Sequence, residues 1–247
     1  MKKCWFNLLL ILALSPVMAA EKYDQAYYQS IFEQPHARMH IDAASSLQWA
    51  GLSDPALFDL VAKRLEEVAP FADSKQNIDH AAWLIKALGF SGNEKYREVL
   101  VQYQGNNFHK KLRKYANQAN TQLSLHAQWN PIINDRKLFD DQQSLHHNRL
   151  ANMLRSDQLE LKRIAAKRIH YDHFYTPYLL NLLEQQLKQE VATMGGSKLA
   201  IDTYAWMTKA LAGSSQYKYR PTVQAIADQA PERKLRKYAN RYLNYFK

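Results

Sequence analysis

The chain has 247 residues, with 33 Lys and Arg against 23 Asp and Glu and a formal net charge of +10. Its only cysteine, Cys4, lies at the extreme N-terminus, so a disulfide scaffold and a thiol nucleophile are excluded for the remainder. A chain of this size builds a core large enough to fold without such covalent staples.

The first 19 residues have the pattern of a cleavable signal peptide. Lys2 and Lys3 form a basic start, residues 8–14 an apolar core, and small residues end the segment at Ala19, with cleavage after Ala20 as the alternative. The apolar run is too short to span a bilayer as a helix. We therefore expect a periplasmic or secreted bacterial protein with no transmembrane helix after cleavage.

Removal of this segment leaves a formal charge near +8. A basic balance in a cytosolic protein would suggest nucleic acid. In an exported protein it points to acidic protein surfaces, lipid headgroups or anionic envelope polymers, or to solubility alone. We expect no nucleic-acid partner.

Helical periodicity dominates from residue 37 onward. In residues 53–68, Pro55 occupies a first turn and apolar residues follow at spacings of three and four. Residues 79–88 repeat this pattern and stop at Gly89 and Gly92. Helices of this length joined by short turns predict an antiparallel stack.

An internal duplication follows. Residues 79–117 and 202–240 are identical at 17 of 39 positions without a gap, including Lys111–Asn117 repeated as Lys234–Asn240. Such self-similarity is typical of stacked repeat architectures. The similarity continues upstream when the alignment is shifted by one residue. The two repeat units are then about 37–123 and about 159–246, with about five helices each, and a connector of about 124–150 lies between them.

The segment Asp157–Ile169 places an Asp, a basic pair and small residues in the order of a HEAT repeat, with weaker echoes at Lys95–Arg97 and Leu112–Ala116. The chain resembles the HEAT-like (armadillo/HEAT type) repeat family over most of residues 20–247, although residues 126–149 fit no repeat. That resemblance implies a single all-α domain, an α-solenoid of antiparallel helix pairs whose concave face binds another protein. Lys162-Arg163 departs from the usual Val-Arg.

Trp83 and Trp206 occupy equivalent positions among alanines. We expect each ring to fill core space, in preference to stacking on a ligand. Lys86 and Lys209 follow three residues later, so each is expected to bury its stem beside its Trp while the ammonium stays in water.

Two basic helices are the main candidate for a binding site. The repeated heptapeptide and the cation before it place four positive charges within two turns of each copy. They form either a solvated face or a site for an anion or an acidic partner. The residues are Lys110, Lys111, Arg113, Lys114, Arg233, Lys234, Arg236 and Lys237.

The connector is the second candidate. Residues 124–150 look poor in helical order and carry apolar side chains, with Trp129 and Phe139 as candidate contacts of a binding loop. The alternative is a seam in which these side chains plug the junction between the two copies.

Neither metal nor catalytic signatures stand out. His36 and His40, like His170 and His173, share a helix face or a turn, but neither pair occurs in a zinc motif. We expect no metal and no cofactor. The sequence predicts a non-enzymatic protein-binding or scaffolding protein of the bacterial cell envelope. One alternative is a binder of anionic lipid or glycan through the repeated basic helices; another is a hydrolase with an unrecognised site.

Overall fold

The computed structural model describes residues 21–247, so the predicted signal peptide lies outside the described residues. Within that range every regular element is helical and no strand occurs. The α-helices are α1 (Gln25–Glu33), α2 (Ala37–Leu47), α3 (Pro55–Val68), α4 (Lys75–Phe90), α5 (Arg97–Gln102), α6 (Lys110–Ile133), α7 (Leu145–Arg155), α8 (Leu159–Tyr171), α9 (Pro177–Glu190), α10 (Lys198–Gly213), α11 (Arg220–Gln229) and α12 (Arg233–Tyr242).

Helix starts follow the sequence signals. The Asp54 side chain accepts a hydrogen bond from the Ala56 amide at the start of α3, where Pro55 fills the first turn. Thr176 caps α9 in the same way before Pro177. Both copies therefore begin the equivalent helix, α3 or α9, with a polar cap and a proline.

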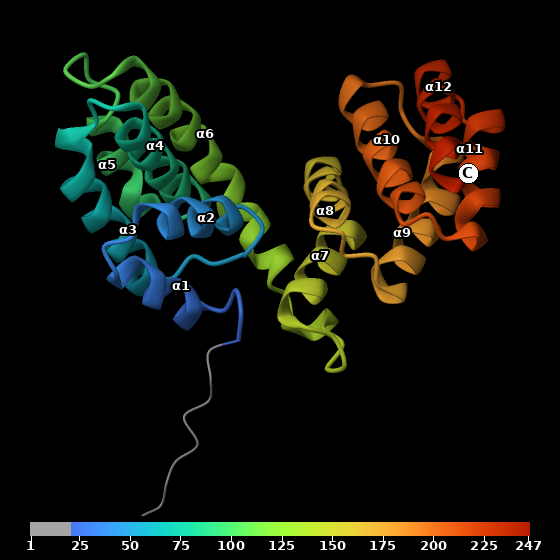
Figure 1. The fold of residues 1–247 in the computed structure, drawn as a ribbon, viewed down its shortest axis with the longest axis horizontal. Helices are drawn as coiled ribbons and strands as arrows, with labels where there is room; N and C mark the ends of the chain where they lie inside the picture. Colours follow the sequence, from blue (N-terminus) through green and yellow to red (C-terminus); the bar gives the residue numbers. More distant parts are fainter. Residues whose placement is uncertain (1–20) are drawn as a thin grey trace, which may run out of the picture.

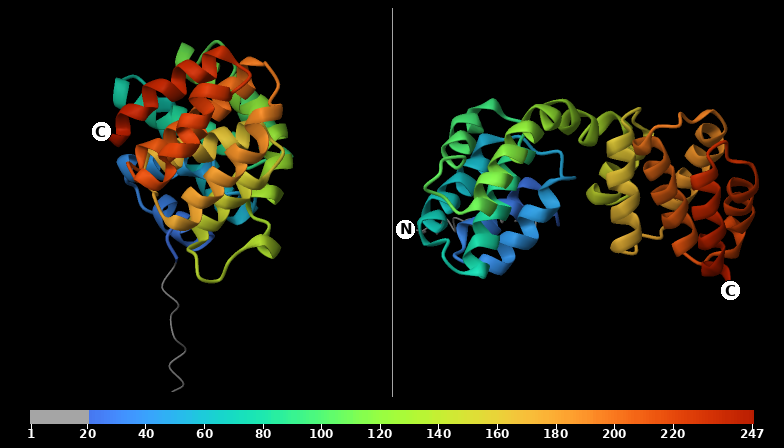
Figure 2. Two further views of the ribbon diagram at one scale, coloured as in Figure 1. Left: turned by 90° about the vertical axis from the view of Figure 1, so that its right-hand side faces the viewer. Right: turned by 90° about the horizontal axis from the view of Figure 1, so that it is seen from above.

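The helices form two stacks, each with two layers. In the first stack α1, α3 and α5 form one layer, and α2, α4 and α6 form the other. In the second stack α7, α9 and α11 form one layer, and α8, α10 and α12 form the other. Figure 1 shows the stacks side by side along the long axis, with α6 running toward the junction, and Figure 2 shows this from above. The predicted all-α solenoid of antiparallel helix pairs is confirmed.

The duplication is visible in the backbone. Gly51 and Gly92 of the first stack have positive φ angles of 65° and 62°. Their counterparts in the second stack, His173 and Ser215, both adopt φ of 56°. Residues other than glycine rarely adopt a positive φ. The second copy therefore has the same turn conformation at these two positions without the glycines.

The second copy begins earlier than the sequence alignment indicates. Helix α7 takes the place in its stack that α1 takes in the first, so each copy has six α-helices rather than about five. The two helices share no obvious identities, only a pattern of buried residues: Tyr28, Ile31 and Phe32 against Leu150, Met153 and Leu154.

The expectation that residues 124–150 are poor in helical order is wrong. Helix α6 continues through Pro131 to Ile133, and α7 starts at Leu145. Asn130 helps to hold the end of α6, because its side-chain amide donates to the carbonyl oxygens of Leu52 and Phe90 at 3.0 Å. A proline near a helix end was the misleading signal.

The stacks have separate cores that meet at the junction. Trp129 of α6 is only 4% exposed and packs in the core of the second stack together with Trp49. The buried Arg149 of α7 donates to the Tyr23 carbonyl oxygen at 2.6 Å, which ties the beginning of the described chain to the second stack. No helix between residues 21 and 247 is both long and apolar enough to cross a membrane.

Candidate functional site on the even-numbered helices

The two repeated tryptophans lie on one surface, which we call the even-helix face: the solvent-facing side of α2, α4, α6, α8, α10 and α12. Trp83 of α4 and Trp206 of α10 are half-buried and pack against the edges of the two cores. The expectation that they fill core space is therefore met only at the edge of each core. Part of each indole stays on the surface because the even-numbered layer of a two-layer stack has no third layer above it.

A lysine ammonium covers each indole, as the sequence spacing predicts. The Lys86 Nζ lies 3.9 Å from the centroid of the Trp83 ring and 4.3 Å from that of Tyr115. In the second stack the Lys209 Nζ lies 4.6 Å from the Trp206 ring. At these distances the ammonium is attracted to the negative ring face.

The second stack adds a further cation. The Lys167 Nζ of α8 lies 5.0 Å from the Trp206 ring, and the Tyr171 ring centroid lies 5.4 Å from that of Trp206. We call Trp83, Lys86 and Tyr115 the first lysine cluster, and Lys167, Trp206 and Lys209 the second lysine cluster. Both copies have thus kept a lysine held against aromatic rings on the same face.

These lysines have no carboxylate partner. Within residues 21–247 no ion pair involves Lys86, Lys167 or Lys209. Burial, and after it the nearby Lys111 ammonium, lowers the pKa of Lys86. Burial, and then Arg163, likewise lowers the pKa of Lys167. The Asp79 carboxylate acts on Lys86, and the Asp202 carboxylate on Lys167, in the opposite direction but more weakly. Both clusters therefore carry positive charge that no direct ion pair within residues 21–247 neutralises, and an incoming anion would be attracted to them.

Two cavities join the clusters across the junction. A cavity of about 430 Å³ is lined by Trp83, Lys86 and Gln118, and one of about 240 Å³ by Arg163, Lys167 and other residues of α8. Both are also lined by Gln48 and Gln122. The cavities are thus adjacent, with amide groups between the two sets of cations.

The face continues to the C-terminal end. Lys209 also lines a cavity of about 490 Å³ with Tyr238, Arg241, Tyr242 and Tyr245. The Tyr238 and Tyr242 rings are stacked, with centroids 6.3 Å apart. Aromatic and basic side chains therefore alternate from α4 to α12.

The basic heptapeptides divide into structural and free cations. Lys111 forms an ion pair with Asp79 of α4. Arg113 donates to the Asn106 side chain and Arg236 to the Ala230 carbonyl oxygen, each at 2.5 Å, so both arginines hold the loop before their helix. The remaining five lie exposed on α6 and α12: Lys110, Lys114, Arg233, Lys234 and Lys237.

The connector candidates lie apart from one another. Trp129 is buried in the second core, which favours the seam interpretation over a loop contact. Phe139 is partly exposed, with the Arg136 guanidinium 4.9 Å from its ring centroid. Its neighbour Leu138 is 50% exposed, so the tip of this loop presents a large apolar side chain to solvent.

The histidines pair in the interior rather than around an ion. The Nδ1 of His40 lies 3.0 Å from the Nε2 of His80, and its Nε2 lies 2.6 Å from the Gln34 carbonyl oxygen. In this chain of hydrogen bonds His40 donates from Nε2 to the carbonyl, and a single proton lies between the two rings, so at most one ring can be charged. Within residues 21–247 no group of three or more His, Cys, Asp or Glu side chains is arranged to hold a metal ion.

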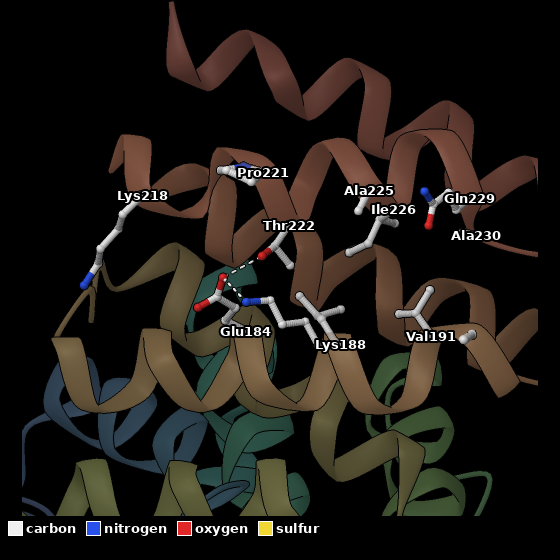
Figure 3. A pocket seen from close by; sticks show the side chains of 12 residues that line it. Glu184, Lys188, Val191, Lys218, Pro221, Thr222, Ala225, Ile226, Gln229 and Ala230 are labelled. Carbon is white, nitrogen blue, oxygen red and sulfur yellow. Dashed lines mark hydrogen bonds and ion pairs between the residues drawn. The ribbon is translucent and has the colours of Figure 1, made fainter.

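A different groove lies on the odd-numbered side, between α9 and α11 (Figure 3). It has a volume of about 370 Å³ and an apolar floor that includes Leu187 and Ile226. Its one carboxylate, Glu184, accepts hydrogen bonds from Thr222 at 2.5 Å and from Lys188 at 2.9 Å. Its carboxylate is thus fully partnered, and the groove carries a single lysine outside any ion pair of residues 21–247, Lys218, whose Nζ lies 4.7 Å from the Tyr219 ring centroid.

Comparisons with known proteins leave the function open. No family model matches the chain, and no match is found among curated proteins. The structure of human deoxyhypusine hydroxylase in complex with glycerol aligns with 90% of this chain and 83% of its own, at 17% identity and a TM-score of 0.32. A likeness of this strength carries no argument about activity.

Proposed function

We propose that this chain is a non-enzymatic protein-binding or scaffolding protein, a HEAT-like member that acts in the bacterial cell envelope and binds an acidic partner on its even-helix face. One observation carries the proposal: both copies hold an unpaired lysine against aromatic rings on this face. Neither ammonium is taken up by an ion pair within residues 21–247.

The test is affinity capture from envelope extract with residues 20–247 as bait, followed by mass spectrometry. A partner bound by wild type should be lost by the double variant Lys86→Glu, Lys209→Glu, with a fall in affinity of at least about 100-fold, because two attractive contacts become repulsive. Lys63 of α3 and Lys218 are exposed on the odd-numbered side. The variant Lys63→Glu, Lys218→Glu carries the same change in charge and should retain the partner.

Equal capture by both double variants would contradict the use of this face. Capture of no defined protein by wild type would contradict the protein-binding function itself. Circular dichroism and thermal unfolding of each variant establish that a loss of capture is not a loss of fold.

The second candidate is a binder of anionic lipid or glycan through the repeated basic helices. Its support is that both copies place cations in the first turn of α6 and α12, where the positive end of the helix dipole disfavours them. The reversal Lys110→Glu, Lys114→Glu, Lys237→Glu leaves Arg113 and Arg236 intact. Under this proposal it should abolish binding to vesicles containing phosphatidylglycerol at about 150 mM salt.

A further inference from the structure

The lysine clusters do not present open stacking platforms. The Lys86 ammonium lies over the Trp83 ring and close to that of Tyr115, while both Lys167 and Lys209 lie over Trp206. A nucleobase or a sugar ring would have to displace these ammonium groups to stack on the indoles. What the clusters present to a ligand is localised positive charge, which suits carboxylates better than flat rings.

The two clusters belong to one continuous track. The first cavity contacts Lys86, the second contacts Lys167, and Gln48 and Gln122 line both. Amide side chains both donate and accept hydrogen bonds, which is what the backbone of an extended peptide requires of a surface. Arg163 and Arg168 line the second cavity, but each already has an aspartate partner, Asp202 and Asp172. The Glu160 carboxylate lines it as well, so a carboxylate of the ligand must sit on the Lys167 side of this cavity.

We infer that the even-helix face binds one extended acidic segment of a partner protein, which places one carboxylate at Lys86 and another between Lys167 and Lys209. This inference rests on the proposed function and names the chemistry of the partner. A folded acidic surface would meet the two clusters less well, because the amide-lined cavities between them would be left unfilled.

Helix spacing sets the length of this segment. The clusters lie on α4 and α10, and the path between them passes α6 and α8. Packed helices lie about 8–10 Å apart, and the step from α6 to α8 is wider because a cavity lies between them, so the three steps span more than about 24–30 Å. An extended chain advances about 3.3 Å per residue, so at least about 8 residues are needed to reach both clusters. Shorter acidic peptides can occupy only one.

The experiment measures the affinity of two peptides for residues 20–247 by isothermal titration calorimetry at about 150 mM salt. The peptides are Glu-Ser repeats of 4 and 16 residues. The longer peptide should bind at least about 100-fold more tightly, because its second contact is intramolecular. Lys86→Gln and Lys209→Gln should each bring the 16-residue peptide close to the affinity of the short one. The matched control Lys63→Gln, Lys218→Gln should leave both affinities unchanged.

Equal affinity of the two peptides, or retention of tight binding by Lys86→Gln, would overturn the inference. Tighter binding of a single-stranded oligonucleotide or an acidic oligosaccharide of equal charge would overturn the choice of polypeptide. If envelope capture depends on Lys86 and Lys209 but the long peptide does not bind, the partner presents a folded surface, so this inference fails while the proposed function stands. If envelope capture does not depend on these lysines and the long peptide does not bind, both the inference and the proposed function fail.

Discussion

The two stacks keep the same surface triad but differ in the polar pairs of their interiors. On the even-helix face Trp83, Lys86 and Tyr115 have direct counterparts in Trp206, Lys209 and Tyr238. Inside, the first stack buries His40 against His80, whereas the second holds the buried Lys162 in an ion pair with Glu190. Packing explains why buried apolar residues are identical in both copies. The lysines of the triad make no ion pair within residues 21–247, which makes their retention the more informative feature.

The largest expected effect comes from a substitution at the junction between the two stacks. Trp129 belongs to a helix of the first stack but packs in the core of the second. Trp129→Ala should lower the free energy of unfolding by about 3–5 kcal/mol, because it opens a cavity. We also expect calorimetry to show two separate unfolding transitions in place of one. Phe139→Ala, at a partly exposed site, is the matched control and should leave a single transition.

Acid should act mainly on the first stack and the junction. Burial lowers the pKa of His80 and of His126 to about 4, and that of His146 to about 3. These rings are neutral in the folded protein but take up protons in the unfolded chain below about pH 6.5. Stability is therefore complete above pH 6.5 and is lost as the pH falls toward 4.

Each of the two nearly inaccessible rings of the first stack, His80 and His126, should contribute about 2 kcal/mol to this loss at pH 5. Hydrogen exchange at pH 7 and pH 5 should show lost protection in α4 and α6 before α10 and α12. His80→Thr, which introduces the residue of the second stack at Thr203, should reduce the difference between the two pH values. Equal losses in both stacks would contradict the assignment.

A repeated tyrosine offers a matched pair. The Tyr96 hydroxyl donates to the Asp59 carboxylate at 2.9 Å, and the Tyr219 hydroxyl to the Asn181 side-chain oxygen at 2.7 Å. Tyr96→Phe should cost about 1–2 kcal/mol, and Tyr219→Phe about 1 kcal/mol, because a hydrogen bond to a charged acceptor is the stronger. Urea denaturation of the two variants at pH 7 measures both, and the reverse order would show that the acceptor charge is not decisive.

The smallest expected effect concerns a turn that has a glycine in the first stack and a serine in the second. Ser215 adopts a positive φ where the first stack has Gly92. Ser215→Gly should raise stability by about 0.5 kcal/mol, since relief of backbone strain exceeds the added freedom of the unfolded chain. Ser214→Gly, at a site with φ of −67°, should lower stability instead. Thermal unfolding distinguishes the two, and a loss in both variants would contradict the strain.

Local and periodic signals predicted the structure correctly. Pro55 occupies the first turn of α3, and the lysines three residues after each tryptophan lie beside its ring, as the spacing predicts. Signals that depend on the neighbouring layer were misleading. Trp83 looked like a core residue because alanines surround it, and residues 124–150 looked irregular although α6 and α7 occupy most of them.

The sequence by itself determined the helices, their duplication and the positive charge of this protein, because periodicity, caps and repeats are properties of neighbouring residues. Only the tertiary structure decided which cations are free. In the folded protein Lys111 pairs with Asp79, and the arginines of both heptapeptides bind the loops before their helices. The ammonium groups of Lys86, Lys167 and Lys209 lie above aromatic rings and form no ion pair within residues 21–247. Partners for a charged group come from distant elements, and the stacking of α4 on α6 and of α8 on α10 brings those elements together.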